Sequence, residues 1–125
     1  MKKVSRKAES ERLVEEVING LLEKKGKEIV TLDLRKLDKS VTDFFVLCSG
    51  DSNTHVNALA GSVEHEVHKN LKDKPWHVEG TSNAEWVLLD YVNVVVHIFQ
   101  RSTREHFNIE GLWADAVVKE YDEVA

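Results

Sequence analysis

The chain has 125 residues, one of them a cysteine, and its 17 Lys and Arg face 22 Asp and Glu, so the formal net charge is −5. This length fits one domain with its own hydrophobic core, and the single Cys48 excludes an intramolecular disulfide. The acidic balance argues against a protein that coats nucleic acid with its whole surface, because neutralising phosphates requires an excess of Lys and Arg.

The two ends of the chain differ in charge from the part between them. Residues 1–8 are basic but have no apolar segment behind them, so they do not predict a secretory signal. No apolar run approaches the roughly 20 residues that span a bilayer. We expect a basic N-terminal extension at 1–8, a single domain at 9–120 and an acidic tail at 121–125, in a cytoplasmic protein without a membrane partner.

The first half of the chain alternates helical and strand patterns. Apolar residues recur at helical spacing over 9–25, and residues 28–35 alternate as in a half-buried strand. After a polar turn, residues 44–48 form a continuous apolar run that ends in Ser-Gly, which is typical of a strand buried on both faces. Residues 51–54 offer caps for a helix whose apolar positions run from 56 to 71.

The second half is predicted to be rich in strands. Residues 76–80 favour a short strand, and the runs 84–91 and 93–100 favour a tight hairpin with Val92 between them. Residues 101–108 read as a connection with at most one helical turn. Apolar residues at helical spacing then predict a final helix over 109–117.

These elements give the order α-β-β-α-β-β-β-α. Two of the strands are apolar throughout and need cover on both faces, so we predict an α/β fold with a mixed sheet of about five strands flanked by helices. Four residues are expected in the core, namely Phe45, Leu47, Leu59 and Val95.

Histidines and the cysteine give little support for catalysis. His65 and His68 flank a glutamate, but they are three residues apart rather than the four that a helical zinc motif needs, so no metal site is predicted. Cys48 lies in an apolar run, where a thiol is inert without a nearby base. His97, between Val96 and Ile98, favours a hydrogen-bonded core or sheet-face histidine over a catalytic one.

The turn Ser49–Ser52 lies between a strand end and a helix N-terminus, where a phosphate can bind. It has one glycine and no lysine, so it is not a P-loop. A nucleotidyl transferase would also need paired carboxylates one residue apart on a strand, and the chain contains no D-x-D. We therefore favour a turn with a helix cap over an enzymatic loop, and we predict no cofactor.

The strand that carries Trp86 is the most informative segment. Alternation places Trp86, Leu88 and Asp90 on one face and Tyr91 on the other. A tryptophan beside a carboxylate is common at protein interfaces. Burial on both faces, with Asp90 satisfied by a turn amide, explains the pattern equally well.

Several segments resemble the ribosome silencing factor family (RsfS, also called Iojap-like), in order and with compatible spacing over about residues 10–118. They are Thr42–Gly50, Glu79–Gly80, Glu85–Tyr91, Val94–Phe99 and Leu112–Ala116. The resemblance implies a fold similar to nucleotidyl transferases without their catalytic residues, so we do not expect an enzyme.

The same resemblance implies a partner. Members of the family dock on the fourteenth large-subunit ribosomal protein, block joining of the small subunit and lower translation when nutrients are short; homodimers also occur. We carry the partner-binding role onto Trp86, Leu88 and Asp90, with Glu79 and Tyr91 as further candidates, and expect no sequence-specific nucleic-acid contact. An acidic domain is suited to a basic ribosomal protein.

Two positions depart from the family pattern. Val92-Asn93 stand where the family usually has Gly-Asp, so the hairpin turn is expected to differ, and Phe107 stands near a usual tyrosine. Two other functions stay open beside the first. One is a nucleotide-binding enzyme that uses the turn Ser49–Ser52, and the other is an adaptor that dimerises through the strand bearing Trp86.

Overall fold

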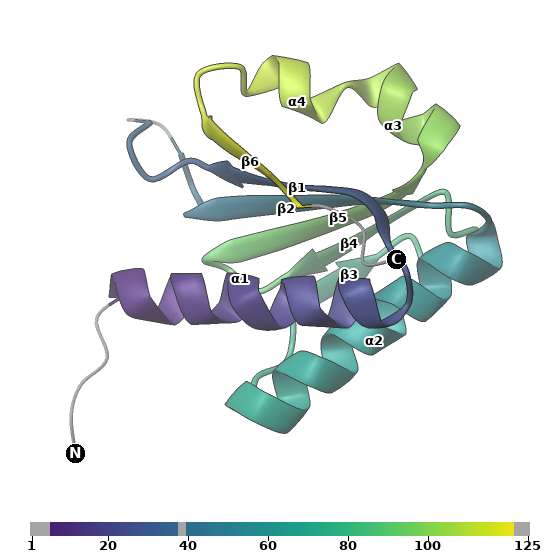
Figure 1. Ribbon diagram of the computed structural model, residues 1–125, viewed down its shortest axis with the longest axis horizontal. Coiled ribbons are helices and arrows are strands. Elements are labelled where there is room, and N and C mark those ends of the chain that lie inside the picture. The colour runs from purple at the N-terminus through teal and green to yellow at the C-terminus, as the bar shows by residue number, and fades with distance from the viewer. Residues whose placement is uncertain (1–5, 38–39, 122–125) are drawn as a thin grey trace.

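The computed structural model describes residues 6–37 and 40–121, and this part of the chain forms one mixed sheet with helices on both sides (Figure 1). The elements are α1 (Arg6–Glu23), β1 (Lys27–Asp33), β2 (Phe44–Gly50), α2 (Asn53–Leu71), β3 (His77–Glu79), β4 (Trp86–Asp90), β5 (Val94–Gln100), α3 (Arg101–Phe107), α4 (Ile109–Leu112) and β6 (Val117–Tyr121). The strand order is β3-β4-β5-β2-β1-β6. Strands β2 and β5 run parallel, and the other neighbours are antiparallel.

The helices α1 and α2 cover one face of the sheet side by side (Figure 1). The predicted apolar stripe of α1 is buried against the sheet and α2. The two helices approach closely at Gly20, where an added Cβ would lie 2.8 Å from the Val63 Cα. Ser62 Oγ donates to the Gly20 carbonyl at 2.7 Å across the same contact, so a small residue at position 20 sets the helix spacing.

The predicted cap of α2 is confirmed. Ser52 has extended backbone angles and its side chain accepts the His55 N–H at 3.0 Å. This satisfies one of the donors that a helix leaves unpaired in its first turn.

The two strands that are apolar throughout lie side by side in the sheet interior, as their sequences predict. β2 and β5 pair over their full lengths, from Phe44 opposite Val94 to Gly50 opposite Gln100. Of the four predicted core residues, Leu47 and Leu59 are fully buried. Phe45 and Val95 are only half-buried, because both point to the face that α3 and α4 cover in part.

The C-terminal region corrects three predictions. The helix expected over 109–117 ends at Leu112, and residues 101–107 form the helix α3 instead of a connection. Val117–Tyr121 form β6, which pairs with β1 and makes the sheet six-stranded rather than five-stranded. The mixed α/β fold class is confirmed.

The predicted extension, domain and tail differ slightly from the element boundaries. Helix α1 begins at Arg6, inside the extension predicted for 1–8, and β6 ends at Tyr121, the first residue of the predicted tail. Within residues 6–37 and 40–121, no helix combines the length and the apolar character needed to cross a membrane.

Candidate functional site

The candidate site lies on β4. Burial alternates along this strand, with Val87 and Leu89 fully buried under α1 and α2 and Trp86, Leu88 and Asp90 half-buried on the opposite face. The structure therefore brings three of the five candidate residues onto one surface. Strand β3 extends that surface, because Glu79 lies opposite Leu88 in the antiparallel register.

Trp86 is held in an aromatic cluster rather than projecting freely. Its ring centroid lies 5.0 Å from that of Phe99 on β5 and 4.9 Å from that of Phe107 on α3. Its indole Nε1–H donates to His97 Nδ1 at 3.1 Å. Trp86 therefore joins the sheet to α3, and its removal would disturb the fold as well as any interface.

His97 lies at the centre of the same cluster and is only 4% exposed. Because its Nδ1 accepts the Trp86 hydrogen bond, the neutral ring carries its proton on Nε2, which has no hydrogen-bond partner within the described residues. Burial lowers the pKa of His97 to about 4, while the negative charge of Asp90 opposes that shift. The sequence prediction of a hydrogen-bonded, buried histidine is confirmed.

Leu88, Glu79 and Asp90 form the more accessible part of this face. The exposed Glu79 carboxylate lies 2.8 Å from His77 Nε2. Asp90 Oδ1 accepts the Val92 N–H at 2.8 Å, which is the turn amide that the sequence offered as an alternative explanation for this carboxylate. The apolar side chain of Leu88 thus lies opposite Glu79 on β3 and two residues before Asp90 on β4. Asp90 also stabilises the turn that follows β4.

Tyr91 does not reach this surface. Its side chain belongs to the core under α1 and α2 and is 3% exposed. Burial raises the pKa of the Tyr91 hydroxyl, with a smaller contribution from the charges of Glu64 and Asp73. A partner on the Leu88 face would not touch the Tyr91 ring, so Tyr91 does not belong to this surface.

Three polar groups of the turn Ser49–Ser52 have partners within the chain. The buried Ser49 hydroxyl accepts from Arg104 Nη1 at 2.9 Å. The Asp51 N–H donates to His55 Nδ1 at 2.9 Å, and Ser52 caps α2. The turn therefore serves α2 and the anchoring of α3, and a phosphate would have to compete with these bonds.

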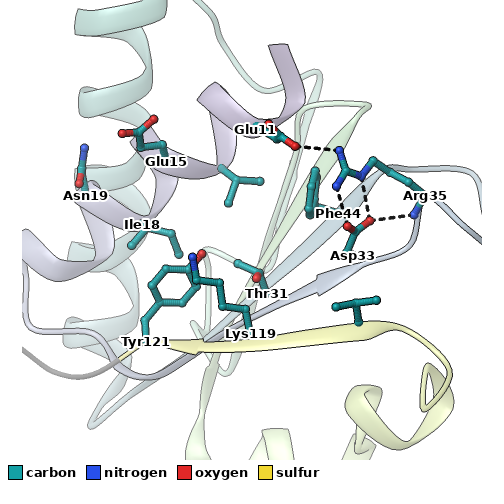
Figure 2. Close-up of a pocket in the computed structure, with 12 residues that line it drawn as sticks. Glu11, Glu15, Ile18, Asn19, Thr31, Asp33, Arg35, Phe44, Lys119 and Tyr121 are labelled. Carbon is teal, nitrogen blue, oxygen red and sulfur yellow. Dashed lines mark hydrogen bonds and ion pairs between the residues drawn. The ribbon is translucent and has the colours of Figure 1, made fainter. Parts of the chain in front are cut away.

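A pocket of about 580 Å³ opens between α1, β1 and β6, away from the β4 face (Figure 2). Arg35 bridges Glu11 at 3.0 Å and Asp33 at 2.7 Å, and its guanidinium lies 4.7 Å from the Phe44 ring centroid. The hydrogen bonds from Arg35 lower the pKa of the Asp33 carboxyl. One cation in this pocket, Arg35, thus pairs with two carboxylates, which leaves the three groups with a net charge of −1. Residues 6–37 and 40–121 contain no cluster of three metal-ligating side chains.

Comparisons with known proteins agree with this architecture. Residues 7–125 match the family model described as "Ribosomal silencing factor during starvation" (RsfS). A ribosomal silencing factor RsfS from Halalkalibacterium halodurans is 33% identical over 118 residues, which cover 92% of this chain and 97% of that protein.

Similarity extends to a solved structure and to an organellar protein. A crystal structure of a protein from Chromobacterium violaceum superposes with a TM-score of 0.78 at 36% identity, covering 83% of this chain and 85% of that one. A mouse protein named "Mitochondrial assembly of ribosomal large subunit protein 1" is 33% identical over 75 residues, 58% of this chain and 32% of that protein. From the family match, the near full-length relative and the shared fold, the chain belongs to the ribosomal silencing factor (RsfS) family.

Proposed function

We propose that this chain binds the large ribosomal subunit through its fourteenth large-subunit protein and so prevents the small subunit from joining. The contact surface is the β3–β4 face formed by Leu88, Asp90 and Glu79. Family membership supports the ribosomal role, and the name of the mouse relative supports the large subunit. The result in the cell is lower translation in the cytoplasm when nutrients are short.

One observation carries the placement of this surface. Leu88 is a half-buried apolar side chain on an open sheet face, and the carboxylates of Glu79 and Asp90 are its neighbours across and along the strands. An apolar anchor with carboxylates at two neighbouring positions fits a partner with an apolar spot bordered by Lys and Arg. The formal charge of −5 favours the encounter with a basic ribosomal protein over one with RNA.

The mechanism is steric and requires no reaction. A compact domain of 125 residues is about 30 Å across by the usual size scaling. An object of this size at the subunit interface is large enough to obstruct a contact between the two subunits. The affinity for the large subunit, rather than a turnover rate, then sets how strongly translation is lowered.

The test is co-sedimentation with isolated large subunits, together with the yield of reassociated ribosomes after small subunits are added. Wild type should pellet with large subunits and reduce reassociation. Leu88→Ala should weaken binding by about tenfold or more through the lost anchor. Asp90→Lys should weaken it further, because it places a cation against a basic partner.

Asp90→Asn is the matched control for the charge. The amide oxygen of Asn still accepts the Val92 N–H, so the turn is kept while the negative charge is removed. Binding by Asp90→Asn should fall between that of wild type and that of Asp90→Lys. Absence of wild-type binding would overturn the function, and normal binding by both Leu88→Ala and Asp90→Lys would overturn the surface.

The same experiments separate the two other functions. Saturable Mg²⁺-dependent ATP binding that is lost in Asp51→Ala would favour a nucleotide-binding enzyme. A stable homodimer that Leu88→Ala dissociates, without any binding to ribosomal subunits, would favour an adaptor that pairs through β4.

A further inference from the structure

Two residues with exposed apolar side chains bond to Asp90 through their backbone N–H groups, at the corner of the sheet where β3 begins and β4 ends. Trp76 is 82% exposed and Val92 is 54% exposed. The backbone of both residues is held by Asp90. The Trp76 N–H donates to the Asp90 carbonyl at 2.7 Å, and the Val92 N–H donates to Asp90 Oδ1 at 2.8 Å. His77, the first residue of β3, lies opposite Asp90 in the antiparallel register, so Trp76 and Val92 adjoin this pair through their backbones and leave their side chains exposed.

The backbone at Val92 is strained. Its φ of 76° lies in the left-handed region, which glycine and asparagine adopt readily and which is an outlier for a β-branched residue. The surrounding turn enforces this conformation through Tyr91 N–H to Val94 O at 2.8 Å and Asn93 N–H to Tyr91 O at 3.0 Å. A side chain that is neither buried nor compatible with a relaxed backbone points to a role in contact with another molecule.

We propose that Trp76 and Val92 form a second anchor for the same basic ribosomal protein, with the adjoining Asp90 receiving a Lys or Arg of that partner. This inference rests on the proposed function. The corner is continuous with the Leu88 surface, because Asp90 belongs to both. An exposed tryptophan beside a carboxylate suits an apolar spot bordered by a cation.

A ribosomal protein fits this corner better than a second copy of the chain does. A symmetric contact centred on Asp90 would bring the two Asp90 carboxylates together across the axis. A basic partner instead supplies the opposite charge to this carboxylate and to nearby Glu79. The preferred occupant is therefore a surface with net positive charge.

The experiment measures the affinity of the full chain for isolated large ribosomal subunits by co-sedimentation, and its thermal unfolding midpoint in parallel. Trp76→Ala removes the exposed indole and should weaken binding by about tenfold. Val92→Asn and Val92→Gly relax the backbone and remove the apolar contact. Both should weaken binding by roughly fivefold while leaving the unfolding midpoint equal to or above that of wild type.

Two controls make the series specific. Val92→Ile keeps a β-branched apolar side chain and should bind like wild type. Leu112→Ala removes an apolar side chain that is 74% exposed on α4, away from the corner, and should also bind like wild type. A variant that is more stable yet binds less tightly cannot owe its defect to misfolding.

The outcomes distinguish this inference from the proposed function. If wild type does not bind large subunits, the proposed function fails and this inference fails with it. If Leu88→Ala weakens binding while Trp76→Ala and Val92→Asn do not, the function stands and the corner is not an anchor. If the corner variants dissociate a dimer without changing ribosome binding, self-association replaces the inference.

Discussion

On one side of β4, Val87 and Leu89 are fully buried beneath α1 and α2, whereas on the other side Trp86, Leu88 and Asp90 of the same strand are only half-buried. The first face is covered by helices of 18 and 19 residues, and the second by helices of 7 and 4 residues. The difference separates two tasks. The closed face supplies most of the apolar burial that stabilises the domain, and the open face keeps a surface for a partner.

The two faces also differ in how their helices are attached. Helices α1 and α2 pack through apolar stripes. Helix α3 is tied down by Arg104, whose Nη1 donates to the Glu28 carbonyl at 2.7 Å and to Ser49 Oγ at 2.9 Å. Helix α3 is therefore held by directed polar contacts in addition to the Trp86–Phe107 ring contact, and a single substitution at Arg104 can remove them.

The largest expected effect compares neighbouring leucines on opposite faces. Leu89→Ala should lower the free energy of unfolding by about 2 to 5 kcal/mol, because it leaves a cavity in the closed core. Leu88→Ala should lower it by less than about 1.5 kcal/mol, since this side chain is already half-exposed. Denaturant unfolding monitored by circular dichroism measures both. Equal losses would mean that the two faces contribute equally to stability.

Acid should weaken the open face through His97. The unfolded chain binds a proton at His97 near pH 6.5, whereas burial lowers the folded pKa to about 4. The contribution of neutral His97 to the free energy of unfolding is therefore fully present above pH 6.5. As the pH falls from 6.5 towards 4, the free energy of unfolding should drop by about 3 kcal/mol in all.

The matched variant for this prediction is His97→Gln, which can still accept the Trp86 indole N–H but does not titrate. The free energy of unfolding of His97→Gln should vary less with pH between 6.5 and 4 than that of wild type. Parallel pH profiles for the two proteins would contradict the assignment of this pH dependence to His97.

Arg104 offers a test of how α3 is held. Arg104→Met keeps much of the side-chain length but removes the donors to Glu28 and Ser49, so stability should fall by about 1 to 3 kcal/mol. Glu110→Gln retains an acceptor for Arg104 Nε at the partly exposed end of the same contact. It should cost less than about 1 kcal/mol in chemical denaturation. If Glu110→Gln lowered the free energy of unfolding more than Arg104→Met, the contact between Arg104 and Glu110 would be the main attachment of α3.

The smallest expected effect is a gain in stability at the β4–β5 turn. Val92→Gly relieves a β-branched residue at a φ of 76°, although the added freedom of the unfolded glycine offsets part of the gain. The free energy of unfolding should rise by about 0.5 to 1 kcal/mol. A decrease would show that the exposed isopropyl group makes a stabilising contact within the chain.

Much of the fold follows from local pattern. The helical stripe of α1, the cap of α2 and the apolar runs of β2 and β5 are each encoded in neighbouring residues, and the alternation along β4 places Leu88 and Asp90 on one face. Periodicity alone accounts for these features, because each element must bury its apolar side. The sequence also allowed the Asp90 carboxylate to be satisfied by a turn amide, and the structure contains that hydrogen bond, from the Val92 N–H to Asp90 Oδ1.

Contacts between distant segments decided the rest. Val117–Tyr121 form a strand because they pair with the free edge of β1. The local sequence of this short segment is compatible with a helix or a strand, and the pairing with a distant segment selects the strand. The same holds for Phe45 and Val95, whose exposure depends on how far two short helices reach across the sheet.

The sequence by itself determined the fold class, the family resemblance and the strand that carries the candidate surface. Only the tertiary structure decided that Trp86 is an internal support for α3, that Tyr91 is buried on the opposite face, and that Trp76 and Val92 both bond to Asp90. The physical reason is that local periodicity sets which face of a strand a side chain occupies. The elements packed on that face then set whether the side chain is reachable.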